Sequence, residues 1–140
     1  GLACHAFRGS YIAVMAEASV GGDQRVQGER LIAAGDCGRV VNPDLVEQQI
    51  EGGLIFGMAA ALGATTGFTG NRPDARSWRA LALPRLADCP QIMVELIGSD
   101  AEPGGVSELA VPPVAPAIAN ALHAATGIRL RQLPLIPGGE

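Results

Sequence analysis

The sequence predicts an α+β fold, in which a mixed sheet is combined with two main helices at about residues 43–63 and 113–126. Two stretches carry apolar residues at helical spacing, and several others alternate in the manner of strands. The predicted order is two strands, helix, loop, strand, helix and strand. Hydrophobic residues make up 48% of the chain and charged residues 17%, a balance that supports a core and argues against disorder. We expect a single domain over residues 1–140.

The predicted strands are bounded by glycine-rich turns. Residues 11–20 alternate as a strand, Gly21-Gly22-Asp23 makes a turn, and residues 25–33 continue as a hairpin partner. Residues 65–84 are irregular because of their glycines and Pro73, and we expect a loop there with a short strand around Trp78. Later strands are predicted at residues 91–97 and 128–133, on either side of the second helix.

Local end signals define both helices. Asn42 is a good N-cap for the first, Pro43 suits its first turn, and Gly63 is placed to end it. The second helix begins near Pro113 and ends at Gly127.

The first helix contains three glycines, Gly52, Gly53 and Gly57. Each costs ~1 kcal/mol relative to Ala in a helix, so we expect them to permit a close approach. A packed neighbouring element is the more common reason for such glycines, and a ligand lying against the backbone is the other. Gln48 and Gln49 lie on adjacent faces of the same helix, and one of them can point inward, where its amide would need partners.

Glu108 is a carboxylate between a glycine-rich run and an apolar, proline-rich run. Such a residue is either a solvated loop charge, which is the more common case, or a desolvated acid with a raised pKa that serves as a general base. Gly104 and Gly105 are a separate candidate, for an anion-binding nest of backbone amides.

Composition excludes several classes of function. The net charge is −4 and the arginines are dispersed, so nucleic-acid binding is not expected. The three cysteines are far apart and complete no metal spacing, so we expect no metal site and treat them as small buried side chains.

The longest apolar run is far shorter than the ~20 residues of a membrane span, and Gly1 to His5 resemble no signal peptide. We therefore expect a soluble chain. The few charges and 19 glycines suggest that part of its surface faces other protein.

Long blocks of the sequence resemble the molybdenum-binding large subunits of the xanthine dehydrogenase and aldehyde oxidase family, most of all the isoquinoline 1-oxidoreductase branch. The first block joins residues 36–43, DCGRVVNP, to residues 49–57, QIEGGLIFG. The second is PGGVSE at residues 103–108, followed by PPVAPAIANALHAATG at residues 112–127. The third is the ending IRLRQLPL at residues 128–135. The resemblance covers nearly the whole chain in the order of the family.

The resemblance implies roles for four residues. Glu108 takes the place of the general base in a hydroxylation that uses water as its oxygen source. Gln49 takes the place of a glutamine that hydrogen-bonds the molybdopterin. Gly52 and Gly53 would let their helix approach the cofactor or the neighbouring domain. The family has glycine where Ser107 stands, and its aromatic motif is altered at residues 77–85.

The resemblance also implies partners. They are the remainder of the large subunit, a separate iron–sulfur small subunit that takes the electrons, and an N-heterocycle or aldehyde as substrate. The cofactor would be molybdopterin, with the cytosine dinucleotide form as one option, and this chain alone would bind none and be inactive. The compartment stays open between cytoplasm and periplasm. A non-catalytic binding or assembly module that keeps the fold is the alternative, suggested by Ser107 and residues 77–85.

Overall fold

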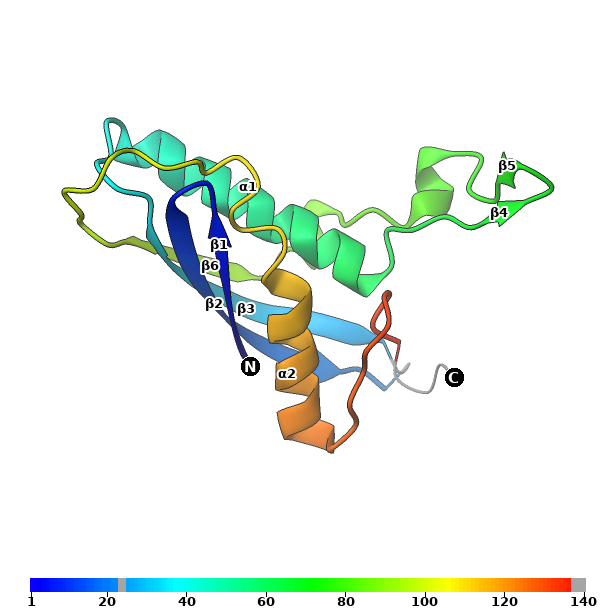
Figure 1. Cartoon of the computed structure of the whole chain (residues 1–140). Coiled ribbons are helices and arrows are strands. Elements are labelled where there is room, and N and C mark those ends of the chain that lie inside the picture. Colours follow the sequence, from blue (N-terminus) through cyan, green and yellow to red (C-terminus); the bar gives the residue numbers. More distant parts are fainter. Residues whose placement is uncertain (23–24, 137–140) are drawn as a thin grey trace.

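The computed structural model describes residues 1–22 and 25–136, which form a sheet with two helices on one of its faces (Figure 1). The sheet has four strands in the order β1-β2-β3-β6. Strands β1, β2 and β3 are antiparallel neighbours, and β6 lies parallel to β3. The strands are β1 (Leu2–Phe7), β2 (Ser10–Val20), β3 (Val26–Asp36) and β6 (Gln91–Leu96). The predicted mixed sheet and α+β class are confirmed.

The core lies between the sheet and the helices α1 (Pro43–Leu62) and α2 (Val114–Thr126). Each strand gives alternate side chains to this core, as the pleat requires. The buried core residues of the sheet are Ile12, Val14, Ala16, Leu31 and Ala33, and those of the helices are Ile50, Leu54, Met58, Ala61, Val114, Ala117, Ile118, Ala119 and Leu122. Helix α2 lies over β1 and β2, whereas α1 lies over β3 and β6.

Both helices end where their sequences predict. The Asn42 side chain accepts a hydrogen bond of 3.1 Å from the amide of Leu45, and Pro43 is the first residue of α1. Gly63 follows α1 with a φ of +134°, and Gly127 follows α2 in the left-handed region with a φ of +75°. Side chains at these two positions would strain the backbone, which is why glycine ends both helices.

Residues 64–90 form an arm that extends away from the end of α1 (Figure 1). The arm contains the two-residue strands β4 (Phe68–Thr69) and β5 (Arg72–Pro73), and the 3₁₀ helices η1 (Trp78–Leu81) and η2 (Leu86–Asp88). The expected strand around Trp78 is wrong, because Ser77 caps a 3₁₀ turn there by accepting from the amide of Ala80. The indole of Trp78 is 79% exposed.

Strand β1 was not among the predicted strands. Its alternation is weak because two of its six residues are alanine, and it is joined to β2 by the two-residue turn Arg8-Gly9. Both turn residues have positive φ, +46° and +83°, as a type I′ hairpin requires. The hairpin predicted for the next two strands is present as β2–β3, and Asp23 of its turn lies outside the described residues.

The predicted strand at residues 128–133 is wrong. After α2 the chain turns back along the helix side of the sheet, where the Arg129 guanidinium donates to the Asn120 side chain. Leu135 is buried, and its amide donates to the carbonyl of Ala61 at 2.8 Å. The segment therefore closes the core at the end of α1 and reaches no strand edge.

The prediction of three buried cysteines holds only for Cys37. Cys4 is exposed on the sheet and Cys89 is half-buried on the arm, and all three thiols are free. Burial, together with the nearby Asp36 charge, raises the pKa of the Cys37 thiol.

Candidate functional site

The loop at residues 99–108 is tied to two turns that are distant in sequence. The Gly104 amide donates to the Cys37 carbonyl at 2.8 Å, and the Gly105 amide donates to the Arg8 carbonyl at 3.0 Å. The Arg39 amide donates to the Ala101 carbonyl at 2.9 Å. These bonds join the two glycine-rich blocks of the sequence into one unit. They also use the amides of Gly104 and Gly105, so the suggested anion nest is not formed there.

Glycine is needed at two points of this unit because the backbones touch. A side chain on Gly38, which has a φ of +71°, would place its Cβ 2.2 Å from the Glu102 carbonyl oxygen. A Cβ on Gly104 would lie 2.2 Å from Oγ of Ser10, a fully buried residue. No larger residue fits without moving the loop, and the loop leads directly to Glu108.

Glu108 stands at the surface between this tied loop and the core. The next two residues, Leu109 and Ala110, are fully buried, and the Val111 amide donates to the Glu108 carbonyl at 3.1 Å. The Ser107 hydroxyl donates to Oε2 of the Glu108 carboxylate. Glu108 is exposed in this chain. The sequence left two possibilities for Glu108, a solvated loop charge or a desolvated general base. In this chain by itself, the carboxylate is solvated.

Gln49 on α1 contacts the residue that precedes Glu108. Its Nε2 donates to the Ser107 carbonyl at 2.8 Å, across 58 positions of sequence. The amide therefore holds the residue next to the candidate base and fixes the distance between α1 and the loop. Gln49 and Gln48 are both exposed, so neither points into the core of this chain.

The three helix glycines do not share one purpose. A Cβ on Gly53 would lie 3.1 Å from Cβ of Ala110, and a Cβ on Gly57 would lie 2.6 Å from the Val111 carbonyl oxygen. Close packing of α1 against the segment after Glu108 explains both glycines. A Cβ on Gly52 would meet no atom within 4 Å. Packing within the described chain gives no reason for glycine at that position.

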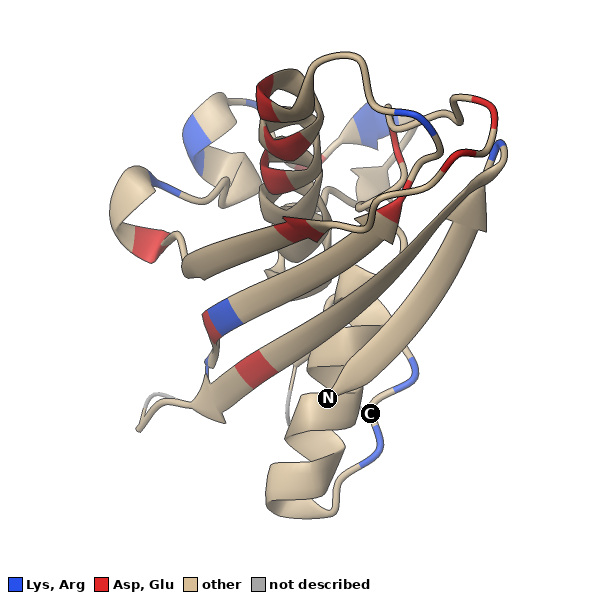
Figure 2. Cartoon of the chain, turned by 90° about the vertical axis from the view of Figure 1, so that its left-hand side faces the viewer, with Lys and Arg blue, Asp and Glu red and all other residues tan. Residues whose placement is uncertain are grey.

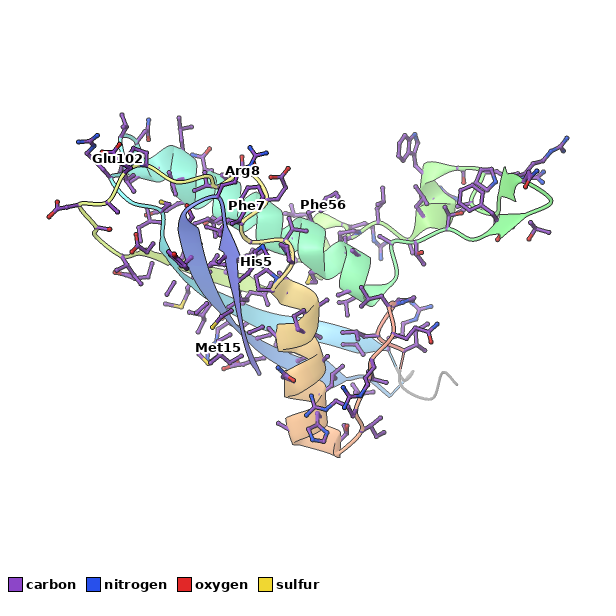
Figure 3. The ribbon with its side chains drawn as sticks, in the orientation of Figure 1. His5, Phe7, Arg8, Met15, Phe56 and Glu102 are labelled. Carbon is purple, nitrogen blue, oxygen red and sulfur yellow. The ribbon has the colours of Figure 1, made fainter. Side chains whose placement is uncertain are left out.

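Gly52 lies on a solvent-facing stripe of α1 together with Gln49 and Phe56. The three residues are spaced by three and four positions and so lie along one face of the helix. All three are exposed, and the Phe56 side chain is 68% exposed (Figure 3). We call Gln49, Gly52 and Phe56 the open stripe. It combines an amide, a bare length of backbone and an aromatic ring.

Arg8 is a further charged residue near the site that the sequence reasoning missed. Its guanidinium lies 5.2 Å from the centre of the Phe7 ring, and a Cβ on Gly105 would lie 3.0 Å from Cβ of Arg8 (Figure 3). The available signal was Gly9, because a glycine readily adopts the positive φ that a two-residue hairpin turn needs. Within residues 1–22 and 25–136, no three His, Cys, Asp or Glu side chains gather to hold a metal ion.

Comparison with known proteins gives a consistent result. Residues 6–90 match the family model described as the molybdopterin cofactor-binding domain. The chain is 34% identical over 109 residues to the membrane-bound aldehyde dehydrogenase [pyrroloquinoline-quinone] of Gluconacetobacter polyoxogenes, covering 78% of this chain and 14% of that protein. It is 32% identical over 138 residues to the isoquinoline 1-oxidoreductase subunit beta of Brevundimonas diminuta, covering 98% of this chain and 18% of that protein.

A solved structure shows the same fold. Quinoline 2-oxidoreductase from Pseudomonas putida 86 superimposes with a TM-score of 0.81 at 18% identity, over 90% of this chain and 17% of that one. The chain thus spans less than a fifth of each of these proteins. The family model includes Gln49, Gly52 and Gly53 but ends before Glu108, which lies within the longer match to the isoquinoline 1-oxidoreductase subunit.

Proposed function

Since this chain belongs to the molybdopterin cofactor-binding domain family, we propose that it forms one wall of the site of a molybdenum-dependent hydroxylase. The substrate class is an N-heterocycle or an aldehyde, and water is the oxygen source. The observation that supports the proposal is the hydrogen bond from Gln49 to the Ser107 carbonyl, because it joins one end of the open stripe to the residue before Glu108.

The residues present fit a pterin cofactor. Gly52 leaves the backbone of α1 uncovered, so a flat group can approach it closely. Gln49 donates through Nε2 to Ser107, and none of the described hydrogen bonds uses its Oε1, so this oxygen can accept from a ligand amine. Gln49 and Gly52 would hold the cofactor, with Gly53 keeping α1 close to the Glu108 loop. The bound group would supply the two-electron oxidation, in which R–H and water give R–OH, two electrons and two protons.

Glu108 would act as the general base. Its Oε2 accepts from the Ser107 hydroxyl, which leaves Oε1 to take a proton from the water-derived nucleophile. The sequence has no Lys, and no Arg forms an ion pair with Glu108 in the described part of the chain, so no cation there stabilises its charged form. The carboxylate is exposed here, and the rest of the longer subunit would have to exclude water from it.

The proposed partners follow from the same reading. They are the remainder of the large subunit and an iron–sulfur small subunit that takes the two electrons. The cofactor would be molybdopterin, with its cytosine dinucleotide form as the specific candidate. No helix in the described ranges is long and apolar enough to cross a membrane.

The test is Glu108→Gln in the longer subunit that contains this chain. A general base contributes typically about 10²–10⁴-fold, so kcat should fall by that factor while molybdenum content stays at the wild-type level. Glu102→Gln is the matched control, because Glu102 is an exposed carboxylate of the same loop on the far side of the glycine ties (Figure 3). Turnover of Glu108→Gln within a few-fold of wild type, at full molybdenum content, would contradict the base assignment.

Cofactor analysis of the same wild-type subunit tests the other half of the proposal. We expect molybdenum and a pterin after acid release. A subunit that contained pyrroloquinoline quinone and no molybdenum would contradict the cofactor assignment, whatever the activity of the variants.

A non-catalytic binding or assembly module is the second candidate. Two observations favour it: the Ser107 hydroxyl is bound to the candidate base, and residues 77–85 depart from the family pattern. Ser107→Gly in the longer subunit separates the two candidates. If the subunit is an enzyme, the Ser107→Gly variant should turn over substrate at least as fast as wild type. If it is a non-catalytic module, neither the wild-type subunit nor the variant should show turnover.

A further inference from the structure

The face of the sheet opposite the helices is apolar and open. Along each strand its side chains alternate with those of the core, so they point away from α1 and α2. We call it the outer face, and its apolar residues are Leu2, Cys4, Ala6, Tyr11, Ala13, Met15, Ile32, Ala34 and Met93. Figure 2 shows the strands in front of the helices, with few charged positions along them. Met15 points away from the helix side in Figure 3.

The strand register arranges the large side chains in a row. Leu2 pairs with Met15, Met15 with Ile32, and Ile32 with Met93, so the row crosses all four strands. Three of its members, Leu2, Met15 and Met93, are 58%, 44% and 58% exposed. Four large apolar side chains in one continuous row are a contiguous patch, which is characteristic of a surface that contacts other protein.

A row of small side chains lies beside the large one. Cys4 pairs with Ala13, and Ala13 pairs with Ala34, so this row crosses three strands. The outer face therefore has a row of large side chains beside a row of small ones, and an apolar layer with its own large side chains can interdigitate with it.

The charges on this face lie toward its edges, where Asp36 is the register partner of Tyr11. Glu17 and Arg30 are register partners and form an ion pair, next to Gln91 on β6. Glu95 lies beside Ala34 at the edge strand. The centre of the patch carries no charge, so an ionic or nucleic-acid partner would find no complement there.

The relatives suggest where the covering layer comes from. This chain aligns with only 17% of the quinoline 2-oxidoreductase chain and with only 18% of the isoquinoline 1-oxidoreductase subunit. In a polypeptide of that length, a covering layer would belong to the same chain and would be present at high effective concentration. Burial of the outer face then costs none of the translational and rotational freedom that two separate chains would lose.

We propose that the outer face is an internal interface, covered by an apolar layer from the remainder of a longer polypeptide, with large side chains of that layer seated over the row Cys4–Ala13–Ala34. The proposal shares with the proposed function only the premise that this chain is part of a longer subunit. Its test measures the yield of folded protein instead of turnover. The interface proposal and the proposed function can therefore fail independently.

The experiment compares Met93→Lys with Gln91→Lys, two substitutions on the same strand and the same face. In the longer subunit, Met93→Lys should lower the yield of folded, soluble protein several-fold, because a lysine would replace an apolar contact inside the interface. Gln91→Lys should match wild type. In the 140-residue chain alone, Met93→Lys should leave the circular dichroism unchanged and reduce binding of a hydrophobic dye.

Ala34→Leu tests the small row without adding a charge. It should reduce the yield of the longer subunit but not that of the 140-residue chain, in which Ala34 is partly exposed on this face. If the Met93→Lys and Ala34→Leu forms of the longer subunit fold with wild-type yield, the outer face is not an internal interface. If the 140-residue chain forms a discrete dimer that Met93→Lys dissociates, the occupant is a second copy and the proposal is wrong.

Discussion

Gly52 and Gly57 lie on one helix, yet the structure predicts that the same substitution has opposite effects at the two positions. Alanine is the better helix former by about 1 kcal/mol. At Gly52 the new Cβ would meet no atom within 4 Å, so Gly52→Ala should gain roughly that amount. At Gly57 the new Cβ would lie 2.6 Å from the Val111 carbonyl oxygen and 2.9 Å from Cγ2 of Val114. Helix α1 would have to move away from α2.

The size of the Gly57 effect follows from two opposing terms. Overpacking a close-packed core costs about 1–3 kcal/mol, and contact with a backbone oxygen belongs at the upper end of that range. Subtracting the propensity gain of about 1 kcal/mol leaves Gly57→Ala roughly 2 kcal/mol less stable than wild type. The two variants should thus differ by about 3 kcal/mol, or roughly 10 °C in Tm for a chain of this size.

The assay is thermal and urea unfolding of the 140-residue chain, followed by circular dichroism. Gly52→Ala should melt above wild type and Gly57→Ala well below it. Gly53→Ala should fall between them, since its Cβ would meet only the Ala110 methyl group at 3.1 Å, where a shift of a few tenths of an ångström suffices. A Gly57→Ala variant as stable as Gly52→Ala would refute the packing argument.

The longer subunit adds a second measurement to the Gly52 variant. If Gly52 is bare because a cofactor lies against it, Gly52→Ala should reduce the molybdenum content of the longer subunit while stabilising the isolated chain. A variant that stabilises both and keeps full molybdenum content would place the cofactor elsewhere.

Three further outcomes are expected. The isolated chain should contain no stoichiometric molybdenum by elemental analysis, because one wall cannot enclose a pterin, and one metal per chain would contradict this. Alkylation at neutral pH should modify Cys4 first and Cys37 last, since Cys4 is exposed and burial raises the pKa of the Cys37 thiol; mass mapping of the labelled peptides measures the order. Asn42→Ala should cost about 1 kcal/mol of unfolding free energy by removing the cap on the Leu45 amide, whereas Asn42→Asp, which can still cap, should cost less.

Short-range signals in the sequence were sufficient for the helices and for most of the sheet. The limits of α1 depend on Asn42, Pro43 and Gly63, which act on backbone groups within a few positions, and the structure has the same limits. Strands β2, β3 and β6 follow from alternation, which the pleat requires wherever one face is buried. The glycine-rich blocks and Glu108 were recognisable in the sequence as family motifs, because they are contiguous runs of residues.

Tertiary structure decided what depends on partners far along the chain. The alternation of residues 128–133 is compatible with a strand, but Leu135 is buried at the end of α1 instead, so the segment has no strand to pair with. The three glycines of α1 look alike in sequence, and only the position of Ala110 and Val111 separates Gly53 and Gly57 from Gly52. Gln49 meets Ser107 across 58 residues because the packing of two helices on one sheet brings them together. Local sequence fixes backbone preference over a few residues, whereas the close approach of distant segments is set by the packing of the whole core.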